Sequence, residues 1–257
     1  MRELHSFRVE AIVLRHSDWG EADRLLTLYT REQGKIRAIA KGARKITSRK
    51  AGHLEPLTRV KLQLARGRDL PIVTQAEASE TYLPLREDLT LLGYALYMLE
   101  LLDRFTYEDA TANPALFRLL SDSLSRLASQ PDPWLVTRYF EMHLLDFLGF
   151  RPRLFECANC ERTILPEDQF FSFSAGGVIC PRCGEGIPNL PSISVEALKY
   201  LRHFQRSSYA EAAKARPTSE VRQEAEKLMQ DYFTYLLERQ LHTPDFLRRV
   251  RSHPRSH

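Results

Sequence analysis

The hydrophobic periodicity changes once along this chain of 257 residues, near Pro84, and that change most limits the folds available. Before Pro84, short segments alternate apolar and polar residues, which is typical of half-buried strands. These segments are residues 8–15, 24–30, 35–40, 59–65 and 70–77. Five short strands within about 75 residues suit a small closed barrel such as an OB-fold.

After Pro84, leucines recur at intervals of three and four residues, as in amphipathic helices. The helices predicted from this spacing are residues 86–105, 113–129, 132–147, 195–205 and 218–240. Asn113-Pro114 and Asp132-Pro133 supply suitable helix starts. The basic tail from Arg248 onwards is expected to fray.

Four cysteines interrupt the helical half as two Cys-x-x-Cys pairs, Cys157/Cys160 and Cys180/Cys183, separated by nineteen residues. Two such knuckles present four thiolates to a tetrahedral ion, which predicts a Zn²⁺ site, with iron as the alternative metal. Because four thiolates fill the coordination sphere, the Zn²⁺ would be structural and not catalytic. Free thiols or redox motifs are the less favoured alternative.

The predicted architecture is therefore α+β: an N-terminal five-stranded OB-fold barrel, then an all-helical domain with an inserted four-cysteine zinc ribbon. Residues 1–82 form the barrel, and residues 83–150 form the first part of the helical domain. Residues 151–191 form the zinc-binding insert, with a strand at 169–173. Residues 192–257 form the second helical part with its basic tail.

Positive charge is concentrated between residues 35 and 68. That segment holds eleven basic residues and one acid, Glu55, so it carries +10, whereas the rest of the chain carries −6 of the total +4. A basic module on an acidic body favours a polyanionic partner, although charge runs are often ordinary solvated surface. The candidate nucleic-acid contacts, which are DNA-binding residues if the partner is DNA, are Lys35, Arg37, Lys41, Arg44, Lys45, Arg49, Lys50, Arg59, Lys61, Arg66 and Arg68.

Catalytic patterns are weak. Glu21 and Asp23 suit a turn with ion pairs, and Glu141, His143 and Asp146 suit a satisfied polar helix face better than an acid–base site. No phosphate-cradling glycine loop or serine-hydrolase elbow is present. We therefore expect a protein that is not an enzyme.

No apolar run reaches the roughly 18 residues of a membrane span, and the first residues lack the apolar core of a signal peptide. We therefore expect a cytoplasmic protein without membrane contact, and a nucleic-acid partner would associate it with the nucleoid. Three aromatic residues could stack on bases, namely Phe7, Trp19 and Tyr29, although the spacing places Tyr29 in the barrel core.

Residues 11–30 and 32–44 closely resemble the bacterial recombination mediator family RecO, and the Ala-Lys-Gly-Ala-Arg loop at 40–44 is the most specific motif. The resemblance implies an N-terminal OB-fold, a helical C-terminal domain and an inserted zinc ribbon. It also implies a non-catalytic protein that binds single- and double-stranded DNA and anneals complementary strands. With RecR and RecF, such proteins help load RecA onto strands coated with single-stranded-DNA-binding protein, whose C-terminal tail is an expected partner.

Two other functions remain open at this point. A generic RNA-binding or translation-associated OB-fold protein would use the same barrel and basic loop, because neither distinguishes the sugars. A metal-dependent nuclease is disfavoured, because no carboxylate or histidine cluster surrounds an open metal site in the sequence.

Overall fold

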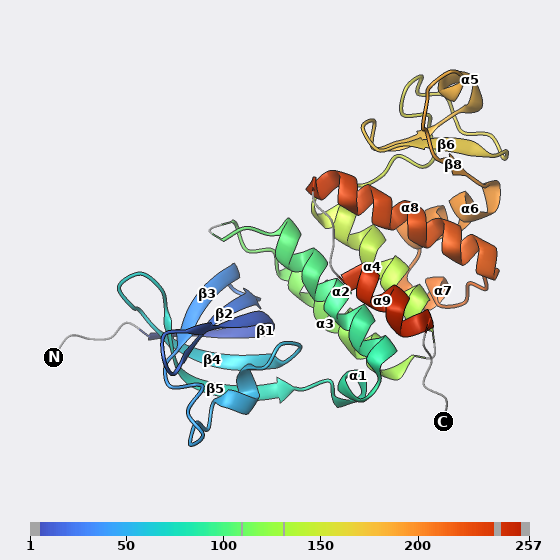
Figure 1. Cartoon of the computed structure of the whole chain (residues 1–257). Helices are drawn as coiled ribbons and strands as arrows, with labels where there is room; N and C mark the ends of the chain where they lie inside the picture. The colour runs from blue at the N-terminus through green and yellow to red at the C-terminus, as the bar shows by residue number, and fades with distance from the viewer. Residues whose placement is uncertain (1–5, 109, 131, 239–242, 253–257) are drawn as a thin grey trace. The chain divides into compact units, whose positions relative to one another are not determined.

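The computed structural model describes residues 6–108, 110–130, 132–238 and 243–252. Its N-terminal part is a closed barrel of five strands in the order β1-β2-β3-β5-β4 (Figure 1). The strands are β1 (Ser6–Trp19), β2 (Asp23–Thr30), β3 (Gly34–Ala40), β4 (Arg59–Ala65) and β5 (Ile72–Glu80). The predicted OB-fold is confirmed.

The long first strand holds the barrel together. Its first half pairs with β4 and its second half with β2, with a register shift between Val13 and Arg15. The strand therefore runs on to Trp19 instead of ending at residue 15, because pairing with β2 continues as far as Asp23. The barrel closes where β3 meets β5 in parallel, at the single pair Ile39 and Ile72.

Alternate side chains of the strands fill the barrel. The interior cluster includes Val9, Ala11, Val13, Leu26, Leu28, Ala38, Ala40, Val60, Leu62, Leu64 and Val73. Tyr29 follows Leu28 and so lies on the outer face, where its hydroxyl donates to the Asn113 carbonyl oxygen at 3.4 Å. Burial there raises the pKa of Tyr29 to about 12. The predicted place of Tyr29 in the barrel core is therefore wrong.

The chain forms two compact units, one of residues 1–129 and 246–257 and the other of residues 130–245. The first unit adds to the barrel a short 3₁₀ turn, η1 (Ala51–Leu54), and the helices α1 (Leu83–Glu87), α2 (Leu89–Phe105) and α3 (Pro114–Ser129). The domain limits expected from the sequence stay a prediction.

A helix also covers the first half of the tail that was expected to fray, residues 248–252. It is α9 (Thr243–Ser252), and only residues 253–257 of that tail lie outside the described residues. Leu247 on α9 is buried, and a Cβ at Gly93 of α2 would come within 2.5 Å of it. The close packing of Leu247 against a glycine explains why this segment is ordered as a helix.

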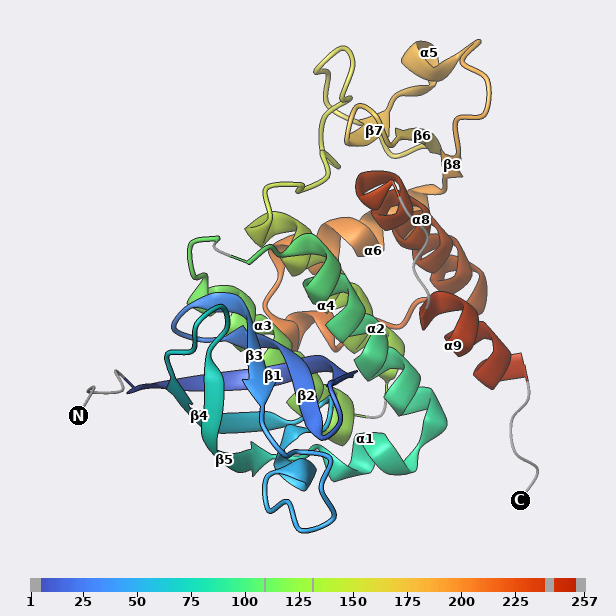
Figure 2. The same cartoon turned by 60° about the vertical axis from the view of Figure 1, so that its left-hand side comes forward.

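In the second unit the described residues form three long helices, two helices of about one turn and a small ribbon. Its elements are α4 (Pro133–Phe147), β6 (Gln169–Ser172), β7 (Gly177–Ile179), α5 (Pro181–Gly184), β8 (Ser192–Ile193), α6 (Val195–Arg206), α7 (Tyr209–Ala212) and α8 (Ser219–Leu237). The ribbon sheet has the order β7-β6-β8, and β8 was not expected from the sequence (Figure 2).

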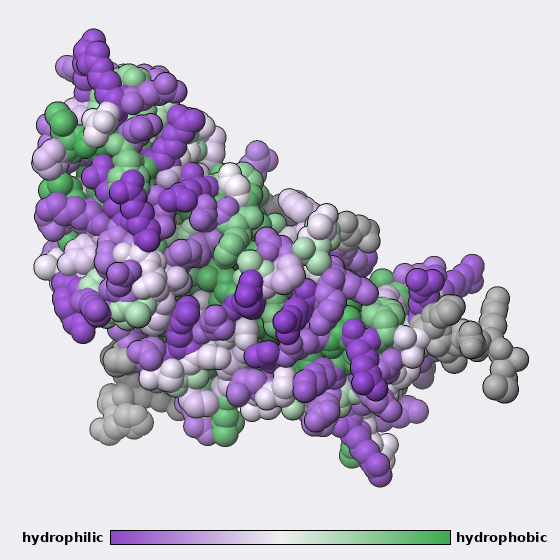
Figure 3. All heavy atoms as spheres, turned by 180° about the vertical axis from the view of Figure 1, so that it is seen from behind, coloured by the Kyte–Doolittle hydropathy of each residue, from purple (hydrophilic) through white to green (hydrophobic). Residues whose placement is uncertain are grey.

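None of the helices described here is long and apolar enough to cross a membrane. Hydrophilic side chains are spread over the face seen in Figure 3.

Asp88 divides the helix that was expected to run from residue 86 to residue 105. Its backbone is extended, and its carboxylate accepts hydrogen bonds from the backbone N–H groups of Thr90 at 2.7 Å and Leu91 at 2.9 Å. An aspartate that satisfies two free N–H groups is a strong N-cap, so α2 begins at Leu89.

We predict that Asp88→Ala lowers the free energy of unfolding by about 1 kcal/mol, because α2 loses its cap. Asp88→Asn should retain most of that stability, since its side-chain oxygen still accepts from the two N–H groups. Urea denaturation of both variants tests this, and equal losses would argue against the capping role.

Candidate nucleic-acid interface and candidate metal centre

Two of the expected DNA contacts on β3 are already paired within the first unit. The Lys35 ammonium lies 2.6 Å from an Asp103 carboxylate oxygen and also donates to the backbone carbonyls of Asp103 and Thr106. The side chain of Lys35 is only 13% exposed. Arg37 forms an ion pair of 2.7 Å with Glu108. The charged face expected on this strand is therefore largely neutralised.

The two cations on β4 also face acidic neighbours. Arg59 approaches a Glu10 carboxylate oxygen at 2.6 Å, and it donates to the Ser121 hydroxyl at 3.1 Å. Lys61 is opposite Glu10 on β1 and opposite Glu77 on β5 in the strand register. Opposite charges at directly paired positions attract, so the outer face of these strands has mixed charge.

Among the described residues, the five candidate cations that lie in loops and do not hold those loops in place are exposed and have no hydrogen-bond or ion-pair partner. We call them the loop cations: Lys41, Lys45, Arg49, Arg66 and Arg68. Three lie in the loop between β3 and β4, and two lie in the loop between β4 and β5. Within residues 41–50 and 66–71, Asp69 is the one acid in the sequence. These side chains are available to an anionic ligand.

The other two candidates hold the β3–β4 loop in place. The Arg44 guanidinium donates to the carbonyls of Gly20 and Glu21 and lies 3.2 Å from Asp18. The Lys50 ammonium donates to the Val73 carbonyl at 3.1 Å. The eleven candidate residues therefore differ in their surroundings: some are paired with acids, two hold a loop in place, and the loop cations are free.

Asp23 also supports the start of this loop, because its carboxylate accepts from the Gly42 backbone N–H at 2.8 Å. This fits the turn role expected for that aspartate.

Both loops begin beside the seam between β3 and β5. The Ile39 backbone N–H donates to the Pro71 carbonyl at 2.8 Å, just before Lys41, and Lys50 reaches β5 at Val73. Figures 1 and 2 show both loops extending away from the barrel. The seam thus anchors two loops whose cations are up to 27 residues apart in sequence, from Lys41 to Arg68.

The four cysteines form a compact cluster in the second unit. Their sulfur atoms all lie within 4.8 Å of one another, and the sulfurs of Cys160 and Cys180 are 3.9 Å apart. Each pair closes a tight turn: the Glu161 N–H donates to the Cys157 carbonyl, and the Cys183 N–H donates to the Cys180 carbonyl. This is the double-knuckle arrangement that the spacing predicts.

The surroundings of the sulfurs suit a cation. Burial by itself raises the pKa of the Cys157 thiol, but backbone N–H groups of Cys160, Cys180 and Asn159 outweigh burial and lower it to about 6. The neighbouring Cys180 and Cys160 thiols raise the pKa of Cys183 to about 12. Without a cation, the four thiols cannot all ionise easily at such short separations. A divalent ion would favour the thiolate form of all four sulfurs.

A glycine allows the second knuckle to pack closely on the ribbon. A Cβ at Gly184 would lie 2.3 Å from the Phe170 ring of β6, which is too close for any other residue.

The polar residues of α4 have structural roles. Glu141 is buried and lies 2.7 Å from the buried Arg138, and the His143 ring lies 4.1 Å from that of Tyr139. Among the described residues, the four cysteines are the one group of His, Cys, Asp or Glu side chains found with metal-binding spacing.

Comparison with known proteins agrees with this architecture. Residues 1–82 match the family model for the N-terminal part of recombination protein O, and residues 86–245 match that for the C-terminal part. The chain belongs to the RecO family. This assignment supports a role as a mediator in DNA repair and recombination, and it confirms the resemblance seen in the sequence.

Individual relatives cover nearly the whole chain. The DNA repair protein RecO of Roseiflexus sp. is 41% identical over 246 residues, which cover 95% of this chain and 86% of that protein. The proteins of the same name from Pelotomaculum thermopropionicum and Dehalococcoides mccartyi are 39% and 37% identical, over 96% and 93% of this chain. These alignments cover 96% and 94% of the two relatives.

Sequence reasoning missed the acids that pair with the strand cations. Asp103 lies in the last turn of α2, and Glu108 lies just beyond that helix. Glu10 lies on β1. Lys35 and the Asp103 carbonyl that it contacts are 68 positions apart, and no local pattern signals such a pair.

We predict that Arg59→Gln lowers the free energy of unfolding by about 1 kcal/mol, because the Glu10 carboxylate loses its 2.6 Å ion pair and keeps the longer one of 3.5 Å to Arg31. The same change at Arg49, a loop cation, should alter stability by less than about 0.5 kcal/mol. Chemical denaturation of both variants tests the division into paired and free cations. Equal destabilisation would show that the division is incorrect.

Proposed function

We propose that this RecO-family chain is a non-catalytic recombination mediator that binds single- and double-stranded DNA through the loop cations. In this role it anneals complementary strands. With RecR, it helps load RecA onto strands coated with single-stranded-DNA-binding protein. The observation that supports the proposal most directly is the set of five unpartnered cations on a barrel whose other basic residues are mostly paired. Binding to chromosomal DNA would place the protein in the cytoplasm at the nucleoid.

The chemistry of the loop cations suits contacts to phosphate. Lysine and arginine on exposed loops neutralise backbone phosphates without reading base edges, so binding would depend on salt and little on sequence. Annealing requires two negatively charged strands to approach each other. Cations that screen their repulsion therefore favour pairing of the strands.

We further propose that Cys157, Cys160, Cys180 and Cys183 hold a structural Zn²⁺. Four thiolates satisfy a tetrahedral ion and leave no position for a reactive water. The ion would fix the two knuckles, because the ribbon strands contain only four, three and two residues and offer little sheet of their own.

Replacing Lys41, Lys45 and Arg49 together by glutamine should weaken binding of single-stranded DNA for all sequences. If each side chain contacts one phosphate, the slope of log K against log salt should fall by about two. Arg44 is left unchanged, because it also holds the loop. Fluorescence anisotropy at several salt concentrations measures both quantities.

The matched control replaces Lys199, Lys214 and Lys227, which are exposed in the second unit and give the same change in net charge. It should leave the salt slope unchanged. The decisive assay mixes complementary oligonucleotides coated with single-stranded-DNA-binding protein and follows their pairing. Binding without faster pairing would contradict the annealing role, and stronger competition by structured RNA would favour an RNA partner.

Cys157→Ser should reduce bound zinc from about one ion per chain and lower the midpoint of thermal unfolding. A chelator should lower the midpoint of the unchanged protein in the same way. The salt dependence of DNA binding should persist, since the loop cations lie on the barrel. Absence of zinc from protein purified without chelator would refute the proposed metal.

A further inference from the structure

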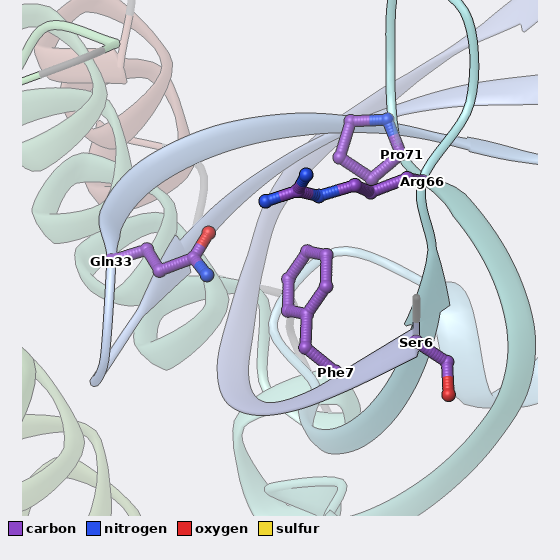
Figure 4. A pocket seen from close by; sticks show the side chains of 5 residues that line it. All are labelled: Ser6, Phe7, Gln33, Arg66 and Pro71. Atoms are coloured by element: carbon purple, nitrogen blue, oxygen red, sulfur yellow. The ribbon is translucent and has the colours of Figure 1, made fainter. Parts of the chain in front are cut away.

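A cavity of about 520 Å³ opens at the barrel, at the end where β1 begins. It is lined by Ser6, Phe7, Gln33, Arg66 and Pro71 (Figure 4). These residues come from the start of β1, the hairpin between β2 and β3, and the loop between β4 and β5. The volume is in the range of small-molecule sites, and none of the described residues that line the cavity carries a carboxylate.

The lining combines a flat apolar surface with polar groups above it. The Phe7 ring packs partly against the barrel core, so the core supports its position. In Figure 4 the Arg66 and Gln33 side chains extend from opposite sides towards the space beside the Phe7 ring. An aromatic face next to an amide and a guanidinium suits a planar group that carries hydrogen-bonding edges and a nearby negative charge.

The backbone holds both polar residues in place. The Gln33 N–H donates to the Thr30 hydroxyl at 2.9 Å, which fixes the β2–β3 hairpin. A Cβ at Gly67 would lie 2.0 Å from the Leu70 carbonyl oxygen, so the turn after Arg66 requires glycine at this position. The cavity is therefore formed by well-defined turns.

We propose that this cavity accepts one unstacked nucleobase of single-stranded DNA. The base stacks on Phe7, its edge bonds to the Gln33 amide, and Arg66 contacts the adjacent phosphate. This inference rests on the proposed function and adds a contact to the base itself. Aromatic rings bind bases of any sequence in this way, because every base has a flat face.

The position of the cavity favours nucleic acid over another planar anion. Arg66 is itself a loop cation, and Arg68 follows it in the same loop. The Pro71 carbonyl oxygen accepts a hydrogen bond from the backbone N–H of Ile39, which is two residues before Lys41. Single-stranded DNA that follows the loop cations across the seam between β3 and β5 therefore passes the opening of the cavity.

Of the three aromatic residues considered for stacking, only Phe7 lies in such a site. Tyr29 is buried under Asn113 on the outer face, and Trp19 is 48% exposed at the end of β1.

Photocrosslinking tests the contact directly in the full chain. A single-stranded oligonucleotide that contains 5-iododeoxyuridine is bound and irradiated, and the modified residue is found by peptide mass spectrometry. We expect an adduct on Phe7. Adducts at other residues only, in a sample that binds the oligonucleotide, would overturn the cavity proposal and leave the proposed function intact. Failure to bind at all would instead contradict the proposed function.

A binding comparison gives a second test. The unchanged protein should bind an oligonucleotide at least about five-fold more tightly than an abasic strand of equal length. Phe7→Leu, which keeps an apolar side chain, should lose most of this difference and retain the salt slope. Gln33→Ala, an exposed position, should reduce the difference even if Phe7→Leu is poorly folded. Phe147→Leu is the matched control, and equal effects at Phe7 and Phe147 would refute the proposal.

Discussion

The ion pair between Lys35 and Asp103 determines which part of the barrel can meet a ligand. Both side chains are largely buried, and a buried charge is stable only when it is paired and hydrogen-bonded. The pair joins β3 to the end of α2, and Arg37 with Glu108 extends the same contact. OB-folds commonly bind oligonucleotides on their second and third strands. Here these two β3 cations are engaged by acids, so β3 itself offers little free positive charge and the loop cations carry most of what the basic segment leaves unpaired.

Within the basic segment, some cations stabilise the fold through ion pairs, and others are free for the proposed binding of DNA. Arg59 is partly buried against Glu10 and contributes to the packing of the first unit, whereas Lys45 and Arg49 are exposed and contribute little to it. The second unit can be stabilised by a different kind of interaction. Its ribbon has too few strand residues to be stable on its own, and the clustered thiols supply a site where a metal ion can hold it.

Much of the architecture could be predicted, because hydrophobic periodicity and cysteine spacing are local properties of the chain. The five strands, the main helices and the cysteine cluster all follow the expected pattern. The errors arose where local and distant interactions compete. Asp88 caps a new helix where the leucine spacing would continue the old one, Tyr29 turns outward and bonds to Asn113, and Leu247, just before the basic tail, packs against Gly93 of α2.

The sequence by itself determined the fold class, the membership of the RecO family, the paired spacing of the four cysteines and the concentration of charge between residues 35 and 68. Only the tertiary structure decided which of those cations are free. Ion pairs such as Lys35 with Asp103 form between residues that are far apart in the chain and become neighbours only when the barrel and α2 pack together. The same folding gathers Phe7, Gln33 and Arg66 around one cavity, because these residues belong to three connections that meet only at the end of a closed barrel.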